Sequence, residues 1–202
     1  MKSFLSLIFS LTIIYTIQAQ TVTDIDGNTY PTVVIGNQTW MAKNLAVTKS
    51  ADGTALTGCY PYLGIEDSVK TFGRMYEWET ARIACPAGWH LPSDEEWTVL
   101  VDFLGGPMVA GGKIKEAGFA HWKEPNKGAD NKSGFTALPA GYRGPKGKFF
   151  NFNKNLAYFW TRTEFDNANA WGYYITYGEP IIYRYGMSFG KKMSFSVRCI
   201  QD

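Results

Sequence analysis

The chain has 202 residues, with 20 Lys and Arg against 18 Asp and Glu, and a formal net charge of +2. The two signs nearly balance, and the sequence has no basic block and no acidic tail. The charge therefore gives no indication of a nucleic-acid or anionic-membrane partner. Aromatic residues make up 16% of the chain beside 21 glycines, and this composition favours turn-rich β structure.

The first 19 residues have the organisation of a secretory signal peptide. Lys2 precedes an apolar run from Phe4 to Ile17, and Ala19 offers a small residue for cleavage before Gln20. The apolar run is too short to span a bilayer comfortably, and no later segment indicates a transmembrane helix. We therefore expect an exported protein, extracellular, at the cell surface or in the periplasm, with residues 20–202 as one domain.

Two hairpins are expected at the start of this domain. Residues 21–30 alternate around an Asp-Gly turn, and residues 33–41 contain two apolar runs joined by Gly-Asn. Residues 48–72 have no sustained period, so they predict a long loop that contains Cys59.

Helical patterns follow the loop. Apolar residues at near-helical spacing cover residues 74–84, which predicts a short helix ending at Cys85. A capping box formed by Ser93 and Glu96 opens the clearest helix, whose apolar face continues towards Leu104. A weaker helical segment is expected at residues 112–117.

Strand patterns dominate beyond residue 135. Short runs rich in aromatic and β-branched residues predict strands at 135–138, 141–143, 158–163, 170–177, 181–185 and 193–200. Because the helices group before the strands, we expect an α+β fold and not an alternating parallel sheet.

Few residues point to catalysis or to a metal centre. His90 and His121 are the two histidines, and neither has the spacing of a zinc site. No nucleophile elbow or EF-hand loop occurs, so we expect no cofactor apart from calcium as a minor possibility. Glu124-Pro125-Asn126 matches a tripeptide with which C-type lectins hold calcium and sugar hydroxyls. Glu124 and Asn126 are therefore candidate calcium ligands, and turn formation is the alternative explanation.

The chain has three cysteines, Cys59, Cys85 and Cys199. In an oxidising compartment two of them are expected to pair, and the sequence patterns alone leave all three pairings open.

Five segments together resemble the Fibrobacter succinogenes major paralogous domain, a family of exported bacterial proteins found in the Bacteroidetes and Fibrobacter groups. They follow one another across essentially the whole mature chain, at residues 34–45, 85–97, 133–143, 158–161 and 195–199.

The resemblance implies a C-type lectin-like α+β fold, with N-terminal β-hairpins, two or three short helices and a C-terminal antiparallel sheet. It also implies a disulfide between Cys85, at the end of the first helix, and Cys199, in the last strand. Cys59 would then be a free thiol. The family has no established biochemical activity, so the resemblance implies no catalytic residues.

We expect a non-catalytic module that binds a glycan or a protein at the cell surface. Exposed aromatic rings stack on the apolar faces of sugars, while Arg and Asn side chains bind hydroxyl groups. The candidate ligand contacts of this kind are Trp122, Asn126, Arg143, Trp171, Tyr183 and Arg184.

Two other functions remain open. Formylglycine-generating enzymes have a lectin-like fold and use a pair of reactive cysteines, but this chain would keep only one thiol beside its disulfide. A structural role in cell-surface assembly is the other alternative, in which Cys59 forms an intermolecular bridge.

Overall fold

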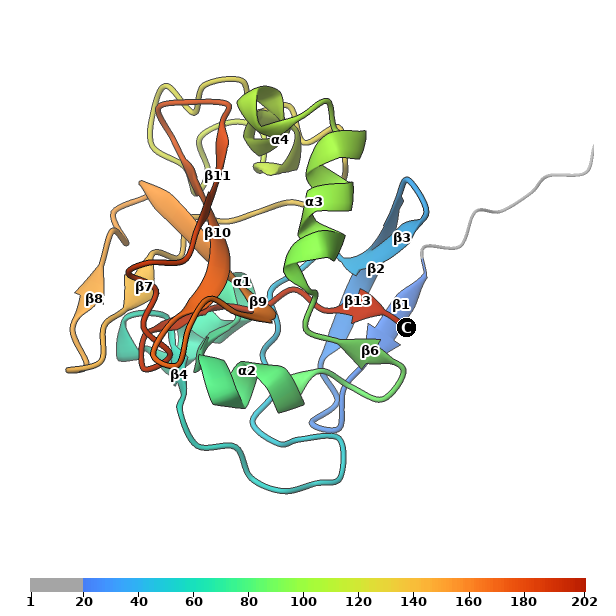
Figure 1. Cartoon of the computed structure of the whole chain (residues 1–202), viewed down its shortest axis with the longest axis vertical. Coiled ribbons are helices and arrows are strands. Elements are labelled where there is room, and N and C mark those ends of the chain that lie inside the picture. Colours follow the sequence, from blue (N-terminus) through green and yellow to red (C-terminus); the bar gives the residue numbers. More distant parts are fainter. Residues whose placement is uncertain (1–19) are drawn as a thin grey trace, which may run out of the picture.

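The computed structural model describes residues 20–202 as an α+β protein with two sheets and four short α-helices (Figure 1). The proposed signal peptide, residues 1–19, lies outside the described residues. No helix within residues 20–202 is long and apolar enough to cross a membrane.

The smaller sheet has the strand order β1-β2-β3-β13-β6. Its strands are β1 (Thr21–Thr23), β2 (Thr29–Ile35), β3 (Gln38–Met41), β6 (Trp89–His90) and β13 (Ile200–Gln201). Both expected hairpins form, since β2 pairs antiparallel with β1 and with β3. The C-terminal strand β13 lies between β3 and β6, so both ends of the described chain belong to this sheet.

The larger sheet has the order β11-β10-β9-β12-β5-β4, and β7 pairs with both β12 and β8. Its strands are β4 (Cys59–Pro61), β5 (Arg74–Glu77), β7 (Tyr142–Arg143), β8 (Phe149–Phe150), β9 (Leu156–Glu164), β10 (Ala170–Thr176), β11 (Ile182–Tyr185) and β12 (Ser194–Ser196). Strands β9 and β12 run parallel, and the other pairs are antiparallel. Strand β11 therefore forms one edge of the sheet.

Two strand predictions need correction. The strand expected at residues 193–200 is divided into β12 and β13, because the chain leaves the larger sheet after Ser196 and joins the smaller one at Ile200. The strand expected at residues 135–138 is a single bridge between Ala137 and Lys115.

The helices are α1 (Val69–Phe72), α2 (Trp78–Ala84), α3 (Asp94–Phe103) and α4 (Pro107–Ile114). Helix α3 is confirmed with its capping box, since Ser93 Oγ accepts from the Glu96 amide and the Glu96 carboxylate accepts from the Ser93 amide.

The other two helix predictions were displaced. Residues 74–77 form β5, because β4 and β12 bond this segment from both sides, and α2 begins only at Trp78. Helix α4 begins earlier than expected, at Pro107, a residue that favours the first helical position. The expected loop at 48–72 also contains β4, α1 and two short 3-10 turns.

Two clusters of buried side chains fill the interior. One is built around the stacked pair Trp160 and Phe195, whose ring centroids are 4.0 Å apart. The other surrounds Trp97, a buried residue of α3. The implied disulfide is confirmed: Cys85 and Cys199 are bonded, and they join the end of α2 to the residue before β13.

Lys115 is a buried cation at the end of α4. Its side chain is inaccessible to solvent, and its Nζ donates to the carbonyls of Lys127, Thr176 and Glu179 at 2.9, 2.9 and 3.0 Å. These bonds join the end of β10 to the segments at Lys127 and Glu179. Burial lowers the pKa of Lys115 from 10.5 to about 8.

Replacing Lys115 with methionine is expected to lower the free energy of unfolding by about 3 kcal/mol at pH 7, because three carbonyls lose their donor. The lowered pKa adds a pH dependence. Between about pH 8 and 10.5 the unfolded chain binds more protons than the folded protein, so the stability of the wild type should rise relative to the variant across this window.

Urea unfolding at pH 7, 8, 9 and 10 measures both effects. Lys132→Met is the control, because the Lys132 side chain is 77% exposed and its loss should change the stability by less than about 0.5 kcal/mol. Equal losses of unfolding free energy in the two variants would show that the carbonyl contacts of Lys115 contribute nothing to stability.

Candidate functional site

The six residues expected to contact a ligand do not form one site. Trp171, Tyr183 and Arg184 lie together on the β10–β11 hairpin. Arg143 lies on β7, where its guanidinium carbon is 3.6 Å from the centroid of the Tyr60 ring. The hairpin is therefore the place where the structure gathers the expected contacts.

Trp122 and Asn126 must be removed from the candidates. Trp122 is 1% exposed and its Nε1 donates to the Ala137 carbonyl at 2.9 Å. Asn126 is 4% exposed, and its Nδ2 donates to the carbonyls of Glu116 and Gly118. Both side chains are used by the protein interior, because a buried polar group needs an internal partner.

The same burial disfavours the calcium site. Glu124 is exposed while Asn126 points inward, so the tripeptide does not present the two side chains to one ion. Within residues 20–202, no three or more His, Cys, Asp or Glu side chains are grouped so that they could hold a metal ion.

Arg184 is held rigidly on the face of the hairpin that packs against α3. Its Nε and Nη2 donate to the two carboxylate oxygens of Asp94 at 2.7 and 2.6 Å, and its guanidinium carbon lies 3.5 Å from the centroid of the Trp171 ring. The hydrogen bonds to Asp94 raise the pKa of Arg184. Asp94, at the start of α3, also accepts from the Tyr173 hydroxyl. Aromatic stacking and a bidentate carboxylate together fix the plane of the guanidinium.

A cavity of about 200 Å³ opens beside Arg184, between the hairpin and helices α3 and α4. Apolar side chains and a few polar ones line it: Val101, Pro107, Ile182, Thr98, Asp102, Tyr173 and Arg184. Nη1 of Arg184 has no hydrogen-bond acceptor within residues 20–202, and the Arg184 side chain is part of the cavity lining. An apolar lining with few polar groups is typical of ligand pockets.

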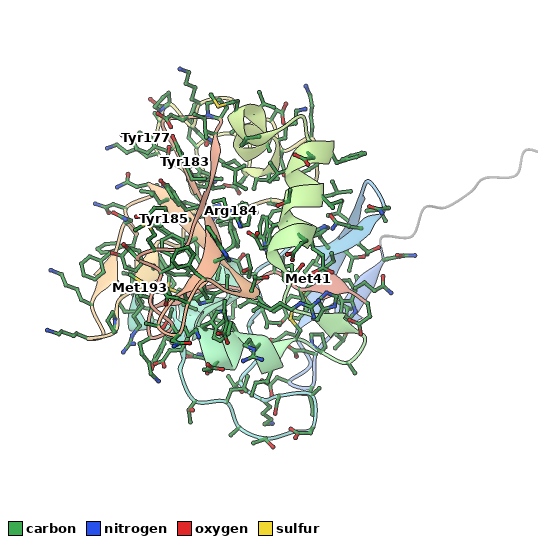
Figure 2. All side chains as sticks on the ribbon, in the orientation of Figure 1. Met41, Tyr177, Tyr183, Arg184, Tyr185 and Met193 are labelled. Atoms are coloured by element: carbon green, nitrogen blue, oxygen red, sulfur yellow. A yellow bond between two sulfur atoms is a disulfide. The ribbon has the colours of Figure 1, made fainter. Side chains whose placement is uncertain are left out.

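The opposite face of the hairpin carries a row of aromatic rings. Tyr183 stacks on Tyr174 at 4.7 Å, and Tyr174 stacks on Tyr158 at 5.5 Å between ring centroids. The row continues through Tyr142 and Phe150 on β7 and β8. Figure 2 shows Tyr183 and Tyr185 on the side away from α3 and Arg184 on the side towards it, as strand alternation requires.

A model of the Fibrobacter succinogenes major domain matches residues 33–201. The chain belongs to this family. No curated protein and no solved structure matches the chain.

In this Fibrobacter succinogenes major domain, three of the family-like segments meet around one buried side chain. Arg198 is 1% exposed, its Nε donates to Asn44 Oδ1 at 2.7 Å, and its Nη2 donates to the Thr136 carbonyl at 2.8 Å. Asn44, Thr136 and Arg198 come from the segments at 34–45, 133–143 and 195–199. These segments therefore build the joint between the two sheets.

Sequence reasoning missed three members of the hairpin site, Asp94, Thr98 and Asp102. In the sequence, Asp94 indicated only the start of a helix. In the structure its carboxylate also accepts from Arg184. Thr98 and Asp102 follow at helical spacing on α3, so an exposed polar stripe on that helix was the available signal. The pairing of Tyr158 with Tyr174 depends on strand register and had no local signal.

Proposed function

We propose that this domain is an exported, non-catalytic binding module whose β10–β11 hairpin recognises a glycan. The observation that carries the proposal is the guanidinium of Arg184. Asp94 and Trp171 fix its orientation, its Nη1 has no acceptor within residues 20–202, and the side chain is part of a cavity with an apolar lining. A fixed donor lowers the entropy lost on binding, since the side chain is ordered in advance.

The cavity suits a sugar in its chemistry. A hydroxyl group can accept from Arg184 Nη1 and donate to the Asp102 carboxylate, while the apolar face of the ring packs on Val101 and Ile182. The rings of Tyr183 and Tyr185 lie on the opposite face of the hairpin and are not part of this cavity. A protein ligand would use the same groups as a pocket for one side chain, and the experiment below separates the two.

We further propose that the fold is C-type lectin-like. The disulfide between the end of α2 and the residue before the last strand supports this proposal, as do the N-terminal hairpins and the antiparallel pairing of β9, β10 and β11. The apolar run that follows Lys2 supports export through the secretory pathway.

A non-catalytic role is supported by the state of the thiol. Cys59 is the one cysteine outside the disulfide, it is half-buried, and burial raises the pKa of its thiol. A raised pKa keeps the sulfur protonated, whereas an oxidase or a protease needs a thiolate. An oxidoreductase of the formylglycine-generating kind, which needs two reactive thiols, is therefore a weaker proposal. An assembly role with an intermolecular bridge through Cys59 is weaker for the same reason.

Screening the purified mature domain on a glycan array, with calcium and again with chelator, tests the proposal. We expect calcium-independent binding that Arg184→Gln weakens about 10- to 100-fold, because one charge-assisted hydrogen bond contributes roughly 1.5 to 3 kcal/mol. Trp171→Ala should weaken binding in the same direction by releasing the guanidinium.

Arg82→Gln is the matched control. Arg82 also lies over a tryptophan, 4.8 Å from the Trp78 ring centroid, and pairs with Glu79, but it is on α2. This control should bind as the wild type does. Binding that is lost with chelator, or that survives Arg184→Gln unchanged, would contradict the proposed site. A domain that binds peptides on a display library and no glycan on the array would replace the glycan with a protein ligand.

A further inference from the structure

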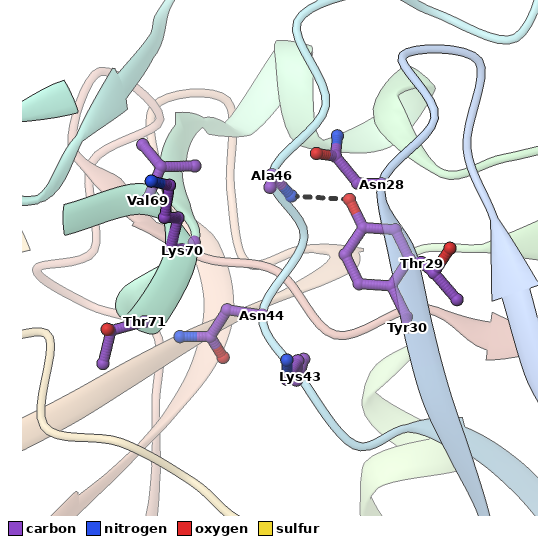
Figure 3. A pocket seen from close by; sticks show the side chains of 10 residues that line it. Asn28, Thr29, Tyr30, Lys43, Asn44, Ala46, Val69, Lys70 and Thr71 are labelled. Carbon is purple, nitrogen blue, oxygen red and sulfur yellow. Dashed lines mark hydrogen bonds between the residues drawn. The ribbon is translucent and has the colours of Figure 1, made fainter. Parts of the chain in front are cut away.

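A cleft lies between α1 and the chain segment at residues 42–46. Two adjoining cavities of about 160 and 260 Å³ form it, and they share Lys43, Asn44, Lys70 and Thr71 in their linings. Arg198 lines the larger cavity, so we call both together the Arg198 cleft. Figure 3 shows the smaller cavity, with Lys70 and Thr71 on α1 and with Asn44 and Lys43 on the neighbouring segment.

Gly73 sets the width of this cleft. It follows α1 with φ +68°, and a Cβ at this position would lie 2.7 Å from Asn44 Cβ and 2.7 Å from the Leu45 carbonyl oxygen. A side chain would therefore push α1 away from the segment at 42–46. The Asn44 side chain also holds the two walls together, because its Nδ2 donates to the Phe72 carbonyl at 2.8 Å.

The charges that line the cleft are mainly positive. Lys43, Lys70 and Arg198 are opposed by one carboxylate, that of Glu116. Glu116 already has a partner, since Nδ1 of His121 lies 2.8 Å from its Oε1. The whole chain has a formal net charge of only +2, so the cleft concentrates cations that the rest of the surface balances.

Arg198 is the unusual member of this group. Its side chain makes four hydrogen bonds, to Asn44 Oδ1 and to the carbonyls of Met41, Phe135 and Thr136. All four acceptors are neutral, and no carboxylate pairs with Arg198 within residues 20–202. A guanidinium has five N–H donors, so one N–H of Nη2 has no acceptor within residues 20–202, and Arg198 lines the larger cavity.

A comparison with Lys115 shows that this arrangement is more than a structural clamp. Lys115 is equally buried, but its three N–H groups have three carbonyl acceptors and none remains. Arg198 has a spare donor and, apart from the Phe135 ring under its guanidinium, no partner for its charge; it lines a cavity. Burying a cation without a counter-charge is costly, and an anion in the cavity would offset that cost.

We propose that the Arg198 cleft is an anion-binding site for a single oxyanionic group, such as a carboxylate, a sulfate or a phosphate. The group accepts from Nη2 of Arg198 at the base of the cleft, and Lys43 and Lys70 neutralise it at the rim. This site is separate from the β10–β11 hairpin and does not depend on the ligand proposed there.

Titration of the ¹⁵N-labelled mature domain with sodium sulfate, followed by NMR, tests the site. The Arg198 Nε–H and the Thr71 backbone amide report on its base and rim. With ionic strength held constant by chloride, we expect saturable shifts with a dissociation constant on the order of 1 mM. Non-saturating shifts, or shifts spread evenly over the protein surface, would overturn the proposal.

Charge-removal variants localise the effect. Lys43→Gln/Lys70→Gln leaves the buried Arg198 network intact and should weaken sulfate binding at least about tenfold, since two rim cations together contribute roughly 1.4 kcal/mol. Lys146→Gln/Lys148→Gln removes the same charge from the loop between β7 and β8 and should leave the affinity unchanged. Equal weakening in the two double variants would show screening by net charge and would refute the site.

The source of the oxyanion is resolved by a second titration, with a galacturonic acid trimer. Tighter binding of the trimer than of sulfate identifies the acidic group of a polysaccharide, and equal or weaker binding identifies a free small anion. Arg184→Gln should leave both titrations unchanged. The experiments can therefore refute the proposal for the hairpin and the proposal for the Arg198 cleft independently of each other.

Discussion

Replacing Cys85 and Cys199 together with alanine is expected to lower the free energy of unfolding by about 4 to 5 kcal/mol. The disulfide joins residues 114 apart in the sequence, and a cross-link across a loop of that length restricts the unfolded chain by about 4.7 kcal/mol in the chain-entropy model. Since domains of this size are stable by roughly 5 to 15 kcal/mol, the variant should be close to its unfolding threshold.

Urea unfolding of the oxidised wild type and the double variant measures the loss. Cys59→Ala is the matched control, because it removes the third cysteine and no cross-link; its cost should be at most about 1 kcal/mol. Dithiothreitol should destabilise the wild type and the control but not the double variant. A loss below about 1 kcal/mol in the double variant would mean that the unfolded chain is already restricted in another way.

Replacing Arg198 with methionine is expected to lower the free energy of unfolding by about 4 kcal/mol. The substitution leaves four buried acceptors without a donor, those of Met41, Asn44, Phe135 and Thr136, and each unsatisfied group costs roughly 1 to 3 kcal/mol with incomplete additivity. Because Arg198 lies between β12 of the larger sheet and β13 of the smaller sheet, the joint between the sheets should loosen first.

Hydrogen exchange and urea unfolding together check this result. The amides of β3 and β12 should lose protection more than those of β9 and β10. Arg198→Lys should lie between wild type and methionine, since an ammonium keeps the charge but has fewer donors in a different geometry. Arg162→Met is the control, because Arg162 is exposed. A cost for Arg198→Met as small as that of the control would refute the structural role.

Four arginines within residues 20–202 lie over aromatic rings, and their surroundings distinguish their roles. Arg82 lies over Trp78 at 4.8 Å from the ring centroid. Arg143 lies over Tyr60, Arg184 over Trp171 and Arg198 over Phe135, at 3.6, 3.5 and 4.5 Å. Arg184 is paired with a carboxylate on one side and borders a cavity on the other, whereas Arg198 is buried among neutral acceptors. The first arrangement suits recognition of a neutral polar ligand, and the second suits an anion.

The family, the α+β class and the best-marked elements were determined by the sequence alone. The capping box at Ser93 fixed the start of α3, because a cap is made by residues only three positions apart. The hairpins at residues 21–41 were equally local. The disulfide pairing followed from the family resemblance, since three cysteines by themselves allow three pairings.

Only the tertiary structure decided which side chains form sites. Trp122 lies between the polar residues His121 and Lys123 and is nevertheless buried, whereas Trp171 lies between Ala170 and Gly172 and stacks on Arg184. Arg184 meets Asp94 across 90 residues, and Arg198 meets Asn44 across 154. The physical reason is that local patterns specify caps, turns and strand faces, whereas burial and the partners of a charged group depend on which strands pair and in which register.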